Sequence, residues 1–383
     1  MTTEQEYLIK LIKAAATQTV PPIPPAGLDM QVLIKLASAS QFDNIIYERF
    51  KLLGIYDESD PLMHTLKQRY GRAVLRDALQ DMELTEIAER FAAEKIPYIP
   101  LKGSTVKNYY PQHDIRRSGD IDILIHPEDL DKADEILRDL GYTCDKRGRD
   151  VHDVYERDKT HIEIHISLTD KKDNAYEFCQ KVWDNSDAKE NYLYEMNPEF
   201  MYVYLIVHLR RHLIHMGGGG IKLILDFWIL NRSFEFNEQK LGSFIHEARL
   251  ENLQRYAEGL MYKWFYDKKT TDEHILMLEQ LLLNSDGHGN YGTYVNMTLA
   301  RGNKGSFMLA KMKNFIHLMC PPLKDMQAKY EILKKYPILL PFSWVKRVFD
   351  ARDEHVKAIA NSVNSLKKDE AQALAEFCNN VEE

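Results

Sequence analysis

The sequence predicts an α+β protein in which a short stretch of strands lies between two helical regions. Apolar residues recur at helical spacing up to about residue 95 and again from about residue 176. Between residues 96 and 168 the period changes to the alternation that is typical of half-buried strands. A strand, a helix, a strand, a helix and further strands follow one another there, which is the order of a small α/β layer.

The N-terminal region, residues 1–95, is expected to be helical. Prolines at 21–27 interrupt the pattern, because proline cannot continue a helix. An amphipathic pattern resumes over residues 30–53, and residues 61–95 predict one long helix.

The central region, residues 96–170, holds the expected strands. Residues 127–142 begin with proline and acids and end near glycine, so they predict a helix. Residues 104–110 suit a short helix. The segments expected to be extended are IPYIPLKG, DIDILI, YTCDKR, HDVYERD and HIEIHISL.

The C-terminal region, residues 171–350, returns to helical patterns. Two apolar helices are expected, MYVYLIVHLRRHLIH and IKLILDFWILN, with four glycines at 217–220 between them. Residues 351–383 are expected to form a charged helical tail.

Composition limits the partners and the compartment. The formal net charge of -8 disfavours nonspecific binding to nucleic acid, which needs a cationic surface. A local basic groove would require convergence of Lys102, Lys107, Arg116, Arg117, Arg210 and Arg211.

No apolar run approaches the ~20 residues that cross a bilayer, so no membrane partner is expected. The four cysteines form no CxxC pair, and a reducing cytoplasm is the expected location.

Three acidic residues form the candidate catalytic centre. Asp120 and Asp122 are two apart on an expected strand, so both carboxylates share one face. Glu163 alternates in the same way in a later strand. If the strands are neighbours, the carboxylates converge and repel one another, and a hard divalent cation such as Mg²⁺ removes that conflict. The alternative is a solvated strand face with ordinary surface acids.

A glycine turn lies upstream of the acids, at Lys102, Gly103 and Ser104. Gly103 permits close approach of the backbone to a ligand, and Ser104 can bind phosphate oxygens or cap the following helix. A plain turn is the alternative. The order of a phosphate-binding turn and then an acid pair is more specific than either part.

These motifs resemble the nucleotidyltransferases of the polymerase-beta type, which have a Gly-Ser turn, an acid-x-acid strand and a third acid on a later strand. The sequence around these motifs, over about residues 30–350, is similar to the uncharacterised nucleotidyltransferase family of bacteria. The further positions that carry this resemblance are His208, His212, the glycines at 217–220, Asp226, Pro321, Tyr330, Leu340, Pro341 and Arg347. Lys102 agrees with this family, whereas the broader superfamily usually has an apolar residue there.

The resemblance implies a small mixed-sheet nucleotidyltransferase core flanked by N- and C-terminal helical regions. It also implies Mg²⁺- or Mn²⁺-dependent transfer of a nucleoside monophosphate from an NTP to an acceptor. Asp120 and Asp122 would bind the ion that bridges the triphosphate, and Glu163 would join them at the second ion. Gly103 and Ser104 would hold the phosphates. Lys102 or Arg116 would neutralise the leaving pyrophosphate.

Histidines near these motifs admit two interpretations. His165, and less strongly His161, would position the acceptor or fill a structural role beside Glu163. His208, His212 and His215 share a helix face that would line the cleft or pack on the core. Asp226 is expected to bond one of these histidines.

Two other functions stay open. One is a catalytically inert or toxin/antitoxin-type module that binds a nucleotide or a partner. The other is a hydrolase with zinc at His161, Glu163 and His165, in which the Gly-Ser turn has no role. The acceptor, whether small molecule, protein or RNA, is not determined by the sequence.

Overall fold

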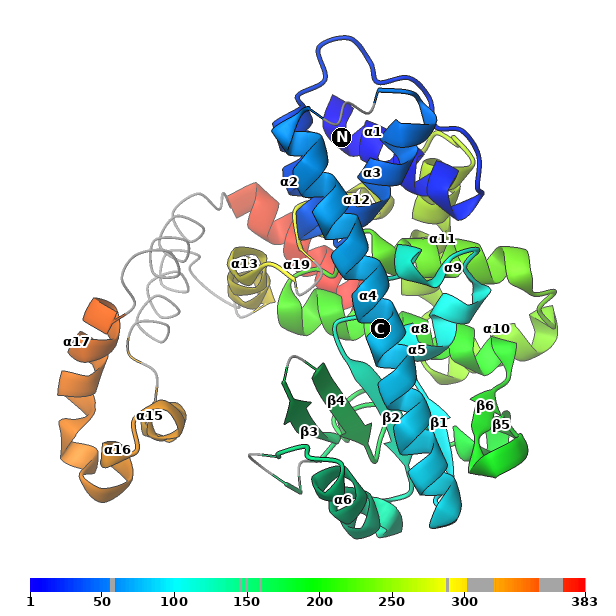
Figure 1. Cartoon of the computed structure of the whole chain (residues 1–383). Helices are drawn as coiled ribbons and strands as arrows, with labels where there is room; N and C mark the ends of the chain where they lie inside the picture. Colours follow the sequence, from blue (N-terminus) through cyan, green and yellow to red (C-terminus); the bar gives the residue numbers. More distant parts are fainter. Residues whose placement is uncertain are drawn as a thin grey trace.

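A four-stranded sheet lies between helical layers in the computed structural model (Figure 1). The structure describes residues 1–55, 59–144, 147–148, 150–158, 160–286, 289–301, 320, 322–350 and 368–382. Helices predominate before and after the sheet, so the α+β prediction is confirmed. Among the described residues, none of the helices has the length and apolar character that a membrane span requires.

The helices described before the sheet are α1 (Thr3–Ala16), α2 (Met30–Ala39), α3 (Asp43–Leu52) and α4 (Pro61–Ala93). Gln41 separates α2 from α3 with φ 64°, a left-handed conformation that ends the first of them. The long helix expected over residues 61–95 is α4. It begins at Asp60, whose side chain accepts a hydrogen bond from the Leu62 amide, and Pro61 stands in its first turn.

The sheet consists of β1 (Tyr98–Pro100), β2 (Ile121–Ile125), β3 (His152–Arg157) and β4 (Thr160–His165), in the order β1-β2-β4-β3. Strands β2 and β4 are parallel, and the other neighbours are antiparallel. The mixed sheet implied by the resemblance is therefore confirmed. Of the strand expected at YTCDKR, the described residues show a single bridge from Thr143 to Glu156; Asp145 and Lys146 lie outside them.

Short elements connect the strands. They are α5 (Gly103–Val106), η1 (Lys107–Tyr109), η2 (His113–Ile115), η3 (Pro127–Asp129) and α6 (Leu130–Asp139). After β4 come α7 (Tyr176–Cys179), η4 (Trp183–Asn185), β5 (Ser186–Ala188), η5 (Glu190–Tyr192) and β6 (Tyr194–Met196). The hairpin of β5 and β6 was not expected, because strands of three residues are too short to show alternation.

The two faces of the sheet differ. Ile121, Ile123 and Ile125 are buried in a core that α4 and α6 complete. Leu124 belongs instead to the larger core formed with the C-terminal helices, on the face that also carries Asp122. The alternation expected for DIDILI thus separates an apolar layer from the face that bears the acids.

The C-terminal helices are α8 (Pro198–Met216), α9 (Lys222–Ser233), α10 (Glu238–Glu247), α11 (Glu251–Phe265), α12 (Glu273–Leu283) and α13 (Tyr291–Arg301). Helix α8 ends at Gly217, which has φ 71°. A Cβ there would lie 2.4 Å from the Asn290 carbonyl oxygen and the Tyr294 amide, so only glycine fits this close approach.

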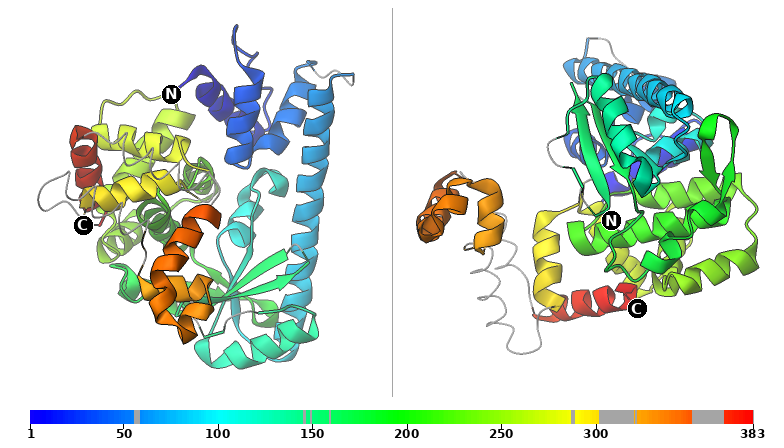
Figure 2. Two further views of the ribbon diagram at one scale, coloured as in Figure 1. Left: turned by 90° about the vertical axis from the view of Figure 1, so that its left-hand side faces the viewer. Right: turned by 90° about the horizontal axis from the view of Figure 1, so that it is seen from below.

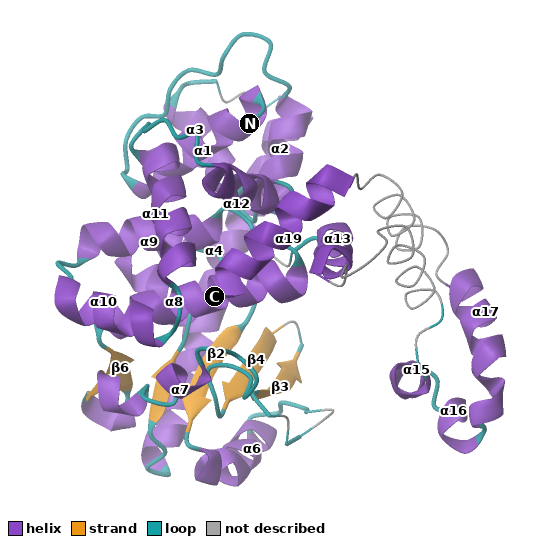
Figure 3. Ribbon diagram, turned by 180° about the vertical axis from the view of Figure 1, so that it is seen from behind, coloured by secondary structure: helices purple, strands orange, loops and turns teal. Residues whose placement is uncertain are grey.

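Two further parts follow α13. Helices α15 (Leu323–Lys329), α16 (Ile332–Lys335) and α17 (Leu340–Asp350), with η6 (Pro337–Leu339), pack on one another and stand apart from the main body (Figures 1 and 3). Helix α19 (Lys368–Glu382) instead packs on α8, α11 and α13, burying Leu374, Phe377 and Val381. The end of the expected tail is therefore part of the helical core; residues 351–367 lie outside the described ones.

Candidate functional site

The acids and the cavity between sheet and helices

The three predicted acids line one cavity of about 160 Å³ between the sheet and helices α8 and α9. Figure 2 shows the sheet between the long helix α4 and the C-terminal helices. Parallel pairing sets Asp122 directly opposite Glu163, and Asp120 immediately precedes β2. The condition on which convergence depended, that the two strands are neighbours, is met.

Lys102 is the nearest cation to these acids. Its Nζ lies 2.6 Å from Asp122 Oδ1 and 3.7 Å from Glu163 Oε2. The backbone of Lys102 has φ 48° and ψ -120°, a conformation that side-chain-bearing residues rarely adopt. Such strain costs about 1–3 kcal/mol and persists where the surroundings enforce it. Here it accompanies an ammonium directed at the two carboxylates.

His165 joins the same two carboxylates from the fully buried end of β4. Its Nε2 lies 2.9 Å from Asp122 Oδ1 and 3.1 Å from Glu163 Oε2. His152, opposite His165 on β3, places Nε2 3.5 Å from Glu163 Oε1. His161 points to a different partner, since its Nδ1 lies 3.2 Å from Glu156 Oε1 at an exposed position. The zinc ligands expected from the sequence were His161, Glu163 and His165. The residues whose ligand atoms lie close enough to share a metal ion are instead His152, Glu163 and His165.

Electrostatics distinguishes the three acids. Burial raises the pKa of Asp120 above its usual range, and the neighbouring Asp122 and Glu163 raise it further. Burial alone would also raise the pKa of Asp122, but Lys102 and His165 outweigh it and hold that pKa well below its usual range. The pKa of Glu163 is lowered against its burial mainly by its hydrogen bond to His165. Two carboxylates are therefore firmly ionised beside a third that resists ionisation.

The turn at Gly103 is closely packed. A Cβ on Gly103 would lie 2.6 Å from Ser118 Oγ and 2.9 Å from Ser118 Cβ. Ser118 in turn donates a hydrogen bond to the Asp120 carbonyl oxygen. Gly103 lines the acid cavity, whereas Ser104 lines a neighbouring cavity of about 600 Å³, and Lys102 lines both.

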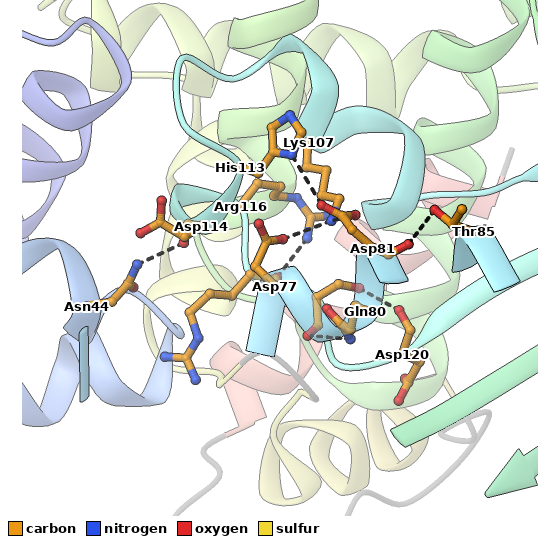
Figure 4. Close-up of polar contacts among 12 residues, drawn as sticks. Asn44, Asp77, Gln80, Asp81, Thr85, Lys107, His113, Asp114, Arg116 and Asp120 are labelled. Atoms are coloured by element: carbon orange, nitrogen blue, oxygen red, sulfur yellow. Dashed lines mark hydrogen bonds and ion pairs between the residues drawn. The ribbon is translucent and has the colours of Figure 1, made fainter. Parts of the chain in front are cut away.

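Helix α4 supports the segment that leads into the acids (Figure 4). Arg76 donates to the Gly119 carbonyl oxygen at 2.7 Å, and Lys107 forms ion pairs with Asp77 and Asp81. These contacts join the long helix to the loop between α5 and β2. The loop that positions Asp120 is therefore held from outside the sheet.

Arg116 and Asp226 form a buried ion pair. The guanidinium donates at 2.7 Å and 2.8 Å to the two carboxylate oxygens of Asp226, and the Tyr110 hydroxyl donates to the same group at 2.7 Å. The expectation that Asp226 bonds a histidine is therefore wrong, because Arg116 and Tyr110 occupy its oxygens. Arg116 still lines the cavity, but its charge is already matched.

Helices α8 and α9 supply the opposite wall of the cavity. His208 and His212 line it, with ring centroids 4.4 Å apart, whereas His215 lines a different cavity. Burial lowers the pKa of His212 to about 4 and that of His208 well below its usual range, so both rings are neutral near pH 7. Arg211 and Lys222 line the same wall.

The basic groove considered from the sequence does not form. Lys102, Lys107, Arg116, Arg117 and Arg210 each pair with a carboxylate: Asp122, Asp77 and Asp81, Asp226, Asp43 and Asp173, respectively. In the part of the chain that the structure describes, only Arg211 of the six has no such pair. Pairing with carboxylates offsets five of the six charges that such a groove would require.

Among the cavity residues that sequence reasoning missed are His152, Lys222 and Gln41. His152 could have been found from the sequence. The short turn between HDVYERD and HIEIHISL implies a hairpin, and the register of that hairpin places His152 opposite His165. Nothing in the sequence indicates that Lys222 and Gln41 line the cavity, because they reach it from segments far apart in the chain.

A divalent ion fits the donor set. Carboxylate oxygens of Asp120, Asp122 and Glu163 are the hard ligands that Mg²⁺ prefers, and Asp122 and Glu163 add to burial in raising the pKa of Asp120. His152, Glu163 and His165 offer a second set, with ligand atoms all within 4.8 Å of one another. A further group, Asp77, Asp81 and His113, already holds Lys107.

Comparison with known proteins agrees with this geometry. Searches of curated proteins and of solved structures each gave no significant match. A family model described as "Uncharacterised nucleotidyltransferase" matches residues 26–266, which include the acids, the glycine turn and helices α8 and α9. The match ends before α15, so the similarity expected at Tyr330, Leu340, Pro341 and Arg347 lies outside it; Pro321 is also outside the described residues. The chain belongs to the uncharacterised nucleotidyltransferase family.

Proposed function

We propose that this protein transfers a nucleoside monophosphate from an NTP to an acceptor, with Mg²⁺ or Mn²⁺ held by Asp120, Asp122 and Glu163. The observation that carries the proposal is the parallel register of β2 and β4, which gathers three carboxylates in one cavity beside Gly103. A structural role has no need of three clustered charges, since burying them is unfavourable. Family membership supports nucleotidyl transfer in general.

The residues of the chain have separate roles. Asp120, Asp122 and Glu163 would hold the ions, which supply charge neutralisation of the phosphates and a lower pKa for the acceptor hydroxyl. In the free protein Lys102 offsets the negative charge of Asp122 and Glu163. When a metal ion offsets that charge instead, the ammonium would be free to contact phosphate oxygens. Gly103 admits the phosphates close to the backbone.

The histidines position these groups. His165 fixes Asp122 and Glu163 through one ring nitrogen, which sets the orientation of both carboxylates. His208 and His212, neutral at the opposite wall, would face the substrate without adding charge. The acceptor hydroxyl would give its proton to Glu163 or to water.

Calorimetry of NTP binding tests the proposal. We expect the wild type to bind one or more of ATP, GTP, CTP and UTP in the presence of Mg²⁺, and Asp120→Ala/Asp122→Ala to lose that binding. Glu156→Gln, at an exposed position of the same sheet, is the control and should bind normally. A folded wild type that binds none of the four would overturn the proposal and favour the inert module.

The cluster of His152, Glu163 and His165 supports a second candidate, a transition-metal hydrolase. Two imidazoles and one carboxylate are ligands that Zn²⁺ accepts, with a fourth position left for water. Zinc that copurifies at one ion per chain and is lost in His152→Ala would favour it. The glycine turn and Asp120 have no role in that reaction.

A further inference from the structure

Four cations line the acid cavity, and they divide into two classes. Lys102 pairs with Asp122, and Arg116 pairs with Asp226. Among the described residues, Arg211 and Lys222 form no ion pair with a carboxylate. Both belong to the helical wall, opposite the acids, at the end of α8 and the start of α9.

Lys222 is held in an unusual setting for a lysine. Its Nζ donates one hydrogen bond, 2.9 Å to Gln41 Oε1, although an ammonium has three donors. Gln41 owes its place to the left-handed turn between α2 and α3. Among the described residues the remaining N–H groups have no protein acceptor, and the side chain lines a space faced by Asp120, Asp122 and Glu163.

The surroundings oppose the charge on Lys222. Burial lowers its pKa to about 7, and Arg116 and Arg117 lower it further against the opposing effects of Asp226 and Asp120. His212, from α8, is a further titratable neighbour. A buried cation without an anion is unfavourable unless a ligand supplies that anion.

We infer that Lys222 and Arg211 form a binding subsite for the pyrophosphate portion of the NTP, on the helical wall of the cavity. The inference rests on the proposed function, in which the acids and their ions contact the triphosphate from the sheet. Arg116 keeps Asp226 as its partner and Lys102 lies beside the acids on the sheet, so the phosphate charge that extends away from the ions meets the two unmatched cations of the helical wall. Phosphate oxygens would complete the hydrogen bonds of Lys222, and Arg211 presents a planar fork that suits them.

Calorimetry with inorganic pyrophosphate and with nucleoside monophosphates, each with Mg²⁺, tests the subsite. We expect Lys222→Met and Arg211→Met each to weaken pyrophosphate and NTP binding roughly 10- to 100-fold, the loss of a charge-assisted hydrogen bond. Monophosphate binding should be unchanged, because that ligand lacks the pyrophosphate. Lys222→Arg should retain most of the affinity. Lys10→Met, which removes a lysine from an exposed pair on α1, is the control for charge.

Proton uptake gives a second readout that a structural role would not produce. Pyrophosphate raises the pKa of Lys222 above about 7, so the wild type should take up more protons on binding, near pH 8, than Lys222→Met. Buffers of different ionisation enthalpy measure this difference. The methionine variant removes an unpaired charge from a half-buried position, so it should fold.

The outcomes separate the two proposals. A wild type that binds Mg²⁺ and NTP as tightly as both methionine variants overturns the subsite and leaves the proposed function standing. Pyrophosphate binding that needs Lys222, without binding of any NTP, overturns the proposed function and with it the assignment of this anion site to the NTP. A wild type that binds neither ligand overturns both.

Discussion

The two walls of the acid cavity differ in whether their charged side chains have partners of opposite charge. On the sheet wall Lys102 and two of the three acids are partnered: Lys102 and His165 bond to Asp122, and His165 also bonds to Glu163. On the helical wall His208 and His212 are held neutral, and Lys222 and Arg211 have no carboxylate partner among the described residues.

This difference separates stability from binding. A matched pair stabilises the arrangement of the residues that form it, and removing one member leaves the other uncompensated. An unmatched buried cation lowers stability in the free protein and is satisfied only by a ligand. We therefore expect variants of matched pairs to lose stability, and variants of unmatched cations to lose affinity while gaining stability.

The largest effect is expected for the matched pair of Arg116 and Asp226. Asp226→Ala should lower the free energy of unfolding by roughly 3–5 kcal/mol, because it leaves a buried guanidinium unpaired. Chemical denaturation measures this loss. The double variant Arg116→Met/Asp226→Leu should recover much of it, and equal losses in the single and double variants would contradict the pairing argument.

Replacing Lys222 is expected to raise the free energy of unfolding rather than lower it. Its pKa is about 7 in the folded protein and 10.5 ordinarily, so between these values the unfolded chain binds more protons and stability rises with pH. Lys222→Met should exceed the wild type in stability by on the order of 2–4 kcal/mol below pH 7, and the gap should close as pH rises towards 10.5. Denaturation at several pH values checks this, and a gap independent of pH would count against an unmatched charge.

A moderate effect is expected at the glycine turn of the sheet wall. Gly103→Ala should lower the free energy of unfolding by about 1–3 kcal/mol, because the new Cβ meets Ser118. Ser118→Gly should remove most of that loss when the two are combined. Thermal unfolding of the single and double variants measures it, and no rescue would mean that the clash lies elsewhere.

The smallest effect is expected for Lys102, a matched cation that an incoming ion would replace. Lys102→Met should bind Mn²⁺ about five- to tenfold more tightly than the wild type when no nucleotide is present, because the ammonium no longer competes for the carboxylates. Mn²⁺ titration followed by electron paramagnetic resonance measures this. Weaker binding by the variant would show that Lys102 assists the ion.

The sequence predicted the sheet wall far better than the helical wall. Alternation in DIDILI and HIEIHISL placed the isoleucines in the core and the acids on one face, because strand geometry repeats every two residues. Arg116 and Asp226 are 110 residues apart, and nothing local in the sequence indicates that they pair. Lys222 and Gln41 meet across 181 residues for the same reason. Contacts between distant elements depend on tertiary packing, which periodicity does not encode.

The spin-echo spectrum of bound Mn²⁺, recorded with a non-hydrolysable NTP, tests the central claim most directly, since it identifies the nuclei beside the metal. The account predicts phosphorus coupling from the triphosphate in the wild type, and its loss in Asp122→Ala. Nitrogen coupling from two histidines without phosphorus coupling would place the metal at His152, Glu163 and His165, and that result would contradict a nucleotidyl-transfer centre formed by the three carboxylates.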